Sequence, residues 1–95
     1  MAVISRPRGR RGGGDDPVAR ELRIGFGNDL RAARRRARLS QAEVAGRVGV
    51  SQRLVSAIER GEQNMTVGTM VAFARALGFD LVVALRLSRE DNSKP

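Results

Sequence analysis

The 95-residue sequence contains neither cysteine nor histidine. Without thiols and imidazoles, disulfide bonds, thiolate chemistry and most transition-metal sites are excluded. The scattered carboxylates form no convincing catalytic pair, so we expect no enzymatic activity, no metal and no cofactor. No apolar run approaches the length of about 18 residues that a membrane helix requires, and no signal peptide is recognisable. We therefore expect a cytoplasmic protein without a membrane partner.

Positive charge is concentrated in the first part of the chain. The formal net charge is +8, and 17 of the 18 basic residues are arginine. Residues 1–38 carry eleven arginines against four acids, whereas residues 39–95 carry seven basic against six acidic residues. This asymmetry is typical of proteins that bind nucleic-acid phosphates. A chain of this length forms one small domain that buries only about two-thirds of its unfolded surface, so dimerisation would help to stabilise it.

The segment 40–61, SQAEVAGRVGVSQRLVSAIERG, contains two helix starts separated by a glycine. Ser40 and Glu43 form the pattern of a capping box, and Ser51 is suited to cap a second helix. Gly49 favours the left-handed conformation that ends a helix. We therefore predict helices over residues 41–48 and 52–60 that cross steeply, as in a helix-turn-helix. The alternative is an ordinary helical hairpin with no role in DNA binding.

This segment resembles the helix-turn-helix of the phage-repressor family, also called the Cro/C1 or XRE family. A small residue, a glycine and two aliphatic residues carry the resemblance at the family's spacing: Ala45, Gly49, Val55 and Ile58. The resemblance implies that the second helix enters the DNA major groove with its N-terminus first. The outward residues that would contact bases there are Gln52, Arg53, Ser56 and Ala57.

Further contacts follow from the same resemblance. The residues placed to hold phosphates, at the start of the first motif helix and before the helix that follows the motif, are Ser40, Gln41, Asn64 and Thr66. The resemblance also implies an ion pair between Arg34 and Glu59, which would tie the preceding helix to the recognition helix.

A long helix is predicted before the motif, at the start of a domain that spans residues 17–78. It begins at Pro17 with Asp16 as its N-cap and runs to about Arg38. Gly25 and Gly27 predict a weak point within it, because glycine lowers helix stability. Its expected buried face recurs every three or four residues: Val18, Leu22, Phe26, Leu30, Ala33 and Ala37.

A fourth helix is predicted after the motif. Thr66 is its expected N-cap and Gly78 its expected end. Its predicted buried stripe consists of Val67, Met70, Phe73, Ala74 and Leu77.

Residues 79–87, FDLVVALRL, place apolar residues at every second position and predict a β-strand. A lone strand cannot satisfy its backbone, so we expect antiparallel pairing with a second copy across a twofold axis. A fifth helix is the alternative. The strand resembles that of HipB-type antitoxins, the DNA-binding halves of toxin–antitoxin operons. The predicted fold is thus an all-α helix-turn-helix domain with a dimerising strand, followed by a polar tail at 88–95.

Residues 1–16 predict a flexible basic arm. Within it, the sequence RPRGR at 6–10 resembles the core of an AT-hook, although arginine replaces the usual proline at position 11. The resemblance implies that the arm lies in a narrow A·T minor groove. The residues that would enter the groove are Arg6, Arg8, Arg10 and Arg11. The alternative is a basic tail that contacts phosphates without reading sequence.

Together these features predict a homodimeric, sequence-specific repressor that binds a palindromic operator in double-stranded DNA. The resemblance implies an antitoxin that represses its own operon, binds a cognate toxin and is associated with the bacterial nucleoid. One alternative is a stand-alone regulator, such as a phage repressor or a restriction–modification controller. Another is a non-catalytic adaptor whose helix-turn-helix contacts proteins.

Overall fold

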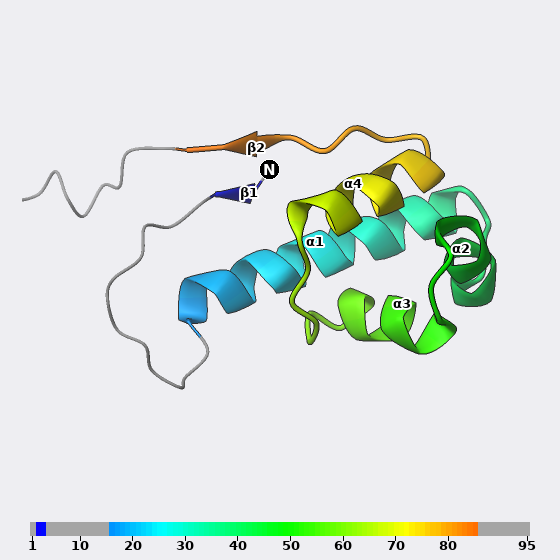
Figure 1. Ribbon diagram of the computed structural model, residues 1–95, viewed down its shortest axis with the longest axis horizontal. Helices are drawn as coiled ribbons and strands as arrows, with labels where there is room; N and C mark the ends of the chain where they lie inside the picture. The colour runs from blue at the N-terminus through cyan, green and yellow to red at the C-terminus, as the bar shows by residue number, and fades with distance from the viewer. Residues whose placement is uncertain (1, 4–15, 86–95) are drawn as a thin grey trace, which may run out of the picture.

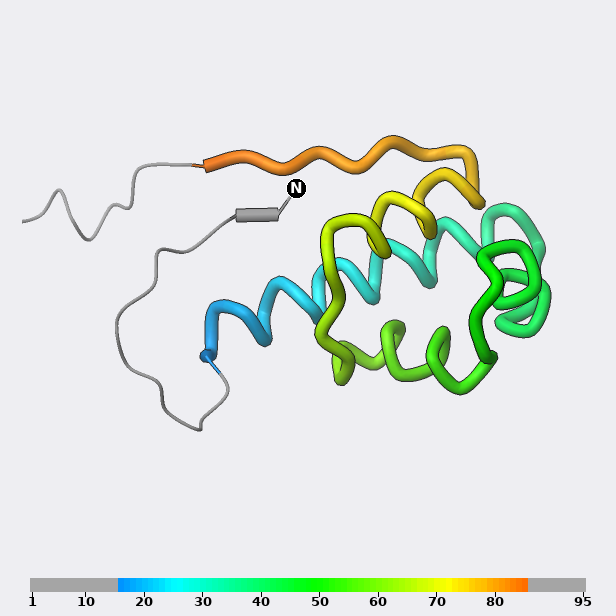
Figure 2. Tube along the Cα trace, viewed as in Figure 1, coloured from blue at the N-terminus to red at the C-terminus, as the bar shows by residue number. Residues whose placement is uncertain are grey.

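Four helices account for most of the residues described by the computed structural model, which are 2–3 and 16–85 (Figures 1 and 2). In chain order the elements are β1 (Ala2–Val3), α1 (Pro17–Arg36), α2 (Gln41–Val48), α3 (Gln52–Glu59), α4 (Val67–Ala76) and β2 (Val83–Ala84). The long helix α1 packs against α3, and α2 packs against both α3 and α4. In Figure 1, α3 lies below α1 and α4 above it.

The caps predicted for α1 and α4 are confirmed. The carboxylate of Asp16 accepts a hydrogen bond from the backbone N–H of Val18 at 2.8 Å. The hydroxyl of Thr66 accepts one from the backbone N–H of Thr69 at 3.1 Å. Gly78 follows α4 with φ at +81°, a left-handed conformation that glycine adopts without strain. The local signals in the sequence therefore locate these helix ends correctly.

The C-terminus of α1 lies two residues earlier than predicted. The helix ends at Arg36, and Arg38 takes a left-handed conformation with φ at +60°. The backbone N–H of Leu39 then bonds to the carbonyl of Arg34 at 3.1 Å. This pattern is a Schellman-type ending, which turns the chain sharply toward α2. The sequence places arginine where glycine is usual, and so hides the turn.

The core is formed by side chains from all four helices. Its buried members are Leu30, Val44, Ala45, Val55, Ile58 and Phe73. Three residues of the predicted faces are exposed: Val18 and Val67 are about half exposed, and Ala37 is the exposed C-cap of α1. The reason is positional, because Val18 and Val67 lie in the first turns of their helices and Ala37 follows the last turn of α1. Within the described part of the chain, no helix is long and apolar enough to cross a membrane.

Gly27 is a close-packing position and not the weak point that the sequence predicts. A Cβ atom there would lie 2.2 Å from the carbonyl oxygen of Ile58 and 3.0 Å from that of Glu59. The backbone of α1 therefore touches the C-terminal end of α3 directly. Gly25, two residues earlier in the same helix, has nothing within 4 Å of the corresponding point. Only one of the two glycines is therefore required by packing.

The predicted strand over 79–87 is wrong in its extent. Within residues 79–85, only Val83 and Ala84 form a strand, β2, and residues 79–82 have neither strand nor helix structure. The partner of β2 is the chain's own N-terminus: β1 pairs with it in parallel, with Ala2 opposite Val83 and Val3 opposite Ala84. The sequence assigns residues 2 and 3 to the basic arm, because a two-residue strand leaves no periodic pattern. The fifth helix is also not formed over residues 79–85.

A groove of about 690 Å³ lies between α1, α4 and the segment 79–83. Apolar side chains dominate its lining, among them Leu22, Phe26, Leu30, Met70, Leu77 and Leu81. Phe79, Val82 and Leu85 are about half exposed or more. The C-terminal segment thus leaves apolar surface that these four helices do not cover.

The contact at Gly27 predicts opposite effects for two alanine substitutions in one helix. Gly27→Ala should destabilise the fold by about 2–3 kcal/mol, because the added methyl group clashes with backbone that cannot rotate away. Gly25→Ala is the matched control and should stabilise the fold by about 0.5–1 kcal/mol through helix propensity. Urea denaturation measures both. Equal effects of the two substitutions would contradict the close approach of α1 and α3.

Candidate nucleic-acid interface

The turn between α2 and α3 has the geometry that the sequence predicts. Ser40 and Glu43 form a complete capping box: the Ser40 hydroxyl accepts from the Glu43 N–H at 3.0 Å, and the Glu43 carboxylate accepts from the Ser40 N–H at 2.7 Å. These bonds lower the pKa of Glu43, with the backbone bond contributing most. Gly49 ends α2 at φ +86°, and the hydroxyl of Ser51 accepts from the Leu54 N–H at 3.1 Å.

Helix α3, which the sequence predicts to be the recognition helix, divides its residues between two faces. Val55, Ile58 and Glu59 are buried and anchor the helix to the rest of the domain. Gln52 and Arg53, predicted to contact bases, are exposed in its first turn. Ser56 and Ala57, predicted for the same role, are only half-exposed. Gln52 and Arg53 are thus the most exposed of the four predicted base contacts.

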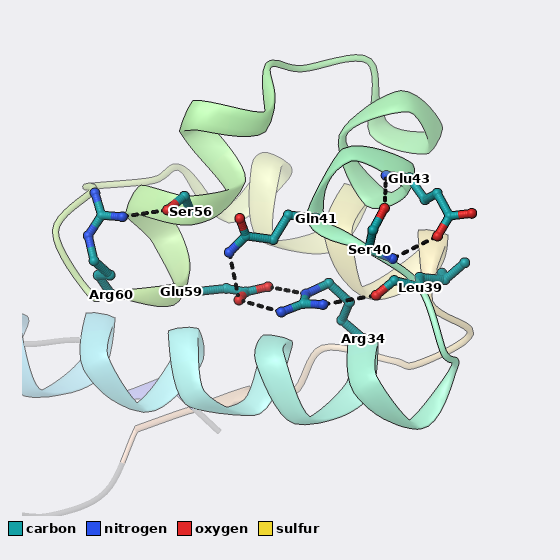
Figure 3. A network of polar contacts seen from close by, with 8 residues as sticks. All are labelled: Arg34, Leu39, Ser40, Gln41, Glu43, Ser56, Glu59 and Arg60. Atoms are coloured by element: carbon teal, nitrogen blue, oxygen red, sulfur yellow. Dashed lines mark hydrogen bonds and ion pairs between the residues drawn. The ribbon is translucent and has the colours of Figure 1, made fainter.

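Glu59 is the one buried charged residue in the described part of the chain, and residues from two other helices surround it (Figure 3). Arg34 donates to both carboxylate oxygens, from Nε at 2.6 Å and from Nη2 at 3.0 Å. Its Nη1 donates to the carbonyl of Leu39 at 2.9 Å. Gln41 adds a bond from Nε2 to Glu59 at 3.1 Å. The predicted Arg34–Glu59 ion pair is therefore confirmed.

The protonation of this cluster follows from its contacts. Burial alone would raise the pKa of Glu59, but hydrogen bonds from Arg34 and Gln41 and the positive charges of Arg34 and Arg31 hold it below its ordinary value. The hydrogen bond to Glu59 raises the pKa of Arg34. Both groups are therefore charged at neutral pH, and the pair is a fixed ionic contact.

Ser40 and Gln41, the predicted phosphate contacts at the start of α2, differ in the groups that they can offer to a phosphate. Ser40 is exposed, and its hydroxyl keeps a proton to donate while it accepts the capping bond. The amide nitrogen of Gln41 is directed to Glu59, so this side chain points into the protein. A phosphate here would be held by the Ser40 hydroxyl and by the backbone N–H groups that open α2, which have no partner within the helix.

The predicted phosphate contacts before α4 are exposed and partly engaged by neighbours. Asn64 accepts a hydrogen bond from Nη1 of Arg23 at 3.1 Å, and Nε of Arg23 donates to the carbonyl of Gly61 at 3.2 Å. Thr66 donates its hydroxyl to Thr69 at 3.0 Å. Arg23 of α1 thus holds the loop that carries Asn64.

Arg23 and Arg60 are functional candidates that the sequence analysis misses. The signal for Arg23 is its spacing, since it shares one helical stripe with Gly27, Leu30 and Arg34. Arg60, the C-cap of α3, donates to the hydroxyl of Ser56 (Figure 3) and pairs with Glu62 at 3.1 Å. No sequence motif points to Arg60, because its role depends on which way α3 faces.

The predicted minor-groove residues Arg6, Arg8, Arg10 and Arg11 lie outside the described residues. Among residues 2–3 and 16–85, no three side chains of the metal-ligating types come together in a group that could hold an ion.

Known proteins are similar to this chain over the region just described. A family model described as a helix-turn-helix domain matches residues 26–90. Two uncharacterized HTH-type transcriptional regulators of Sinorhizobium fredii (strain NBRC 101917 / NGR234) are among the relatives. One, y4dJ, is 41% identical over 58 residues, which are 61% of this chain and 75% of that protein. The other, y4dL, is 44% identical over 55 residues, which are 58% of this chain. The match spans only 28% of the length of y4dL.

Two solved structures share the fold of this chain. The restriction-modification controller protein C.AhdI from Aeromonas hydrophila superposes with a TM-score of 0.61 at 30% identity, covering 64% of this chain and 88% of that one. The clp gene regulator ClgR from Corynebacterium glutamicum superposes with a TM-score of 0.60 at 28% identity. That match covers 61% of this chain and 62% of the ClgR chain.

The buried pair predicts a pH-dependent loss of stability on removal of Arg34. At pH 7, Arg34→Ala should cost about 3 kcal/mol, because it leaves a buried carboxylate unpaired. The folded-state pKa of Glu59 lies below its unfolded value of about 4.3, so the contribution of the pair is complete above that value and is lost as the pH falls through the folded pKa. The stability gap between wild type and Arg34→Ala should therefore narrow toward pH 3.

Arg35→Ala is the matched control for this experiment, since Arg35 is the exposed neighbour in the same helix turn. Its effect should stay below about 0.5 kcal/mol at both pH values. Urea unfolding at pH 7 and pH 3 measures both variants. A gap for Arg34→Ala that is the same at the two pH values would show that the ion pair is not its origin.

Proposed function

The chain belongs to the helix-turn-helix domain family, and we propose that it is a dimeric, sequence-specific repressor of transcription that binds a palindromic operator. Its family relationships make it a DNA-binding transcriptional regulator of the helix-turn-helix type. The repressor role, the dimer and the assigned contacts are the proposal. One observation carries it: α3 buries Val55, Ile58 and Glu59 and leaves Gln52 and Arg53 exposed in its first turn.

The proposed base contacts follow from the chemistry of these two side chains. Gln52 can bond to N6 and N7 of adenine, and Arg53 can bond to O6 and N7 of guanine as a bidentate fork. Ser56 and Ala57 lie farther along α3 and are half-buried, so they would contribute less to base reading. The proposed phosphate contacts are Ser40, Gln41, Asn64 and Thr66, with Gln41 acting through its backbone N–H because its side chain is directed to Glu59, and they would fix the register of α3 on the duplex.

The apolar C-terminal surface supports a homodimer. Phe79, Val82 and Leu85 are exposed beside the groove between α1 and α4, and a second copy would cover them. Among the described residues, β2 pairs with β1 on one side only, so its other edge is available for the antiparallel pairing expected from the sequence. A twofold dimer would present two copies of α3 to successive major grooves, which requires a palindromic operator.

Two biological roles fit such a repressor. An antitoxin that represses its own operon and binds a cognate toxin is supported by the extended segment after α4, which takes the place of a fifth helix. A stand-alone regulator of the restriction–modification controller type is supported by the similarity to C.AhdI. A toxin encoded beside this gene, or one that co-purifies with the protein, would distinguish the first role from the second.

DNase footprinting on the protein's own promoter tests the repressor proposal. We expect two protected half-sites about one helical turn apart. Arg53→Ala should lower the affinity for the operator by about 1–3 kcal/mol and relax the preference at one base pair in each half-site. Arg75→Ala removes the same charge from an exposed position in α4 and should leave that preference intact. If the protein protects no defined sequence, the role as an adaptor is favoured instead.

The arm is proposed to add minor-groove contacts through Arg6, Arg8, Arg10 and Arg11. Its test replaces these four arginines with glutamine and keeps Ala2 and Val3, so that β1 can still pair with β2. We expect protection to be lost at A·T steps that flank the half-sites, and affinity to fall. A footprint of unchanged extent with weaker binding would reduce the arm to a non-specific contact with phosphates.

A further inference from the structure

Arg60 and Glu62 form an exposed pair directly after the recognition helix. The guanidinium of Arg60 reaches back one turn to the hydroxyl of Ser56 and forward to the carboxylate of Glu62, 3.1 Å away. The side chains of Arg60 and Glu62 are 54% and 58% exposed. A pair this exposed contributes little to stability, so folding does not account for the arrangement. Both side chains are, however, accessible to a large ligand.

The position of Arg60 places it beside DNA when α3 is in the major groove. Arg53, Ser56 and Arg60 are spaced by three and four residues, so they follow one stripe of the helix. At 1.5 Å per residue, Arg60 lies about 10 Å beyond Arg53 along the helix axis. The major groove is about 8.5 Å deep, so when the N-terminal residues of α3 contact base edges, its C-terminal end lies near the rim of the groove, where the phosphates lie.

The chemistry of the Arg60–Glu62 pair suggests that a DNA phosphate would replace Glu62 at the guanidinium of Arg60. The planar fork of a guanidinium binds a carboxylate and a phosphate with the same geometry. In the protein described here, the carboxylate of Glu62 occupies one side of that fork and Ser56 holds another. A DNA phosphate at the groove edge would therefore compete with Glu62 for the same donors.

We propose that Arg60 is a phosphate contact of the DNA complex and that Glu62 acts as an internal competitor that DNA must displace. This inference rests on the proposed orientation of α3 in the major groove. Ser56 then serves mainly to position Arg60, which agrees with its lesser part in base reading. Because phosphates carry no sequence information, the exchange lowers affinity for all DNA alike. Glu62 thereby restrains non-specific binding by a chain whose net charge is +8.

A double-mutant cycle tests the exchange. Wild type, Arg60→Gln, Glu62→Gln and the double variant are titrated against a duplex of the protein's own promoter and against a scrambled duplex of equal length. Fluorescence anisotropy at several salt concentrations gives Kd and its salt dependence. We expect Arg60→Gln to weaken binding to both duplexes roughly tenfold at 0.1 M salt and to reduce the salt slope by about one. Glu62→Gln should tighten binding several-fold, but only when Arg60 is present.

Three outcomes would overturn the proposal. An equal gain from Glu62→Gln with and without Arg60 would mean that Glu62 merely repels DNA at long range. A loss from Arg60→Gln that appears on the promoter duplex alone would make Arg60 a base contact. An unchanged affinity for DNA in the Arg60→Gln variant would show that Arg60 does not contact DNA. Thermal unfolding of each variant, expected to match wild type, excludes misfolding as the cause.

The same data separate this proposal from the proposed function. The ratio of wild-type Kd values on the two duplexes tests sequence-specific recognition. The coupling between Arg60 and Glu62 is measured on each duplex independently of that ratio. A Kd ratio near one with intact coupling between Arg60 and Glu62 would refute the sequence-specific repressor and support the exchange of Glu62 for a phosphate. A large Kd ratio with no coupling would support the repressor and refute the exchange.

Discussion

The carboxylate of Glu59 lies where α1, α2 and α3 meet, and its side chain is only 4% exposed. A charge at such a position is tolerated only if it is fully paired. Arg34 from α1 and Gln41 from α2 supply that pairing, so the charge of one residue links all three helices. Gly27 permits the close approach of α1 and α3 that brings Arg34 within reach. The orientation of α3 relative to α1 and α2 therefore depends on the same contact as stability does.

Features that depend on a few consecutive residues are predictable from the sequence. The caps at Asp16, Ser40, Ser51 and Thr66 and the left-handed turn at Gly49 follow from local chemistry, and all are present. The ion pair of Arg34 with Glu59 is predictable for a different reason, because the resemblance to a known family supplies the spatial relation that spacing alone cannot. The assigned DNA contacts rest on that same relation and remain predictions.

Features that depend on distant parts of the chain are not predictable in this way. From the sequence alone, Gly27 is predicted to be a weak helix position. Only the neighbouring backbone of Ile58 reveals that a side chain cannot fit there. β1 is two residues long, too short for any periodicity, so its pairing with β2 has no trace in the sequence. The contacts of Arg23 with Gly61 and Asn64 have no motif, since they lie in a loop that is distant from Arg23 in the sequence.

On α3, the residues that anchor the helix and the residues that face outward form separate sets. Val55, Ile58 and Glu59 hold the helix in place, whereas Gln52 and Arg53 take no part in the core. Substitutions at the second set therefore leave the core intact, and under the proposed function they alter recognition. During gene duplication and divergence, copies of such a domain can drift toward new operators while their folding remains unchanged. The same division makes positions 52 and 53 natural targets for randomised libraries that seek new DNA specificities.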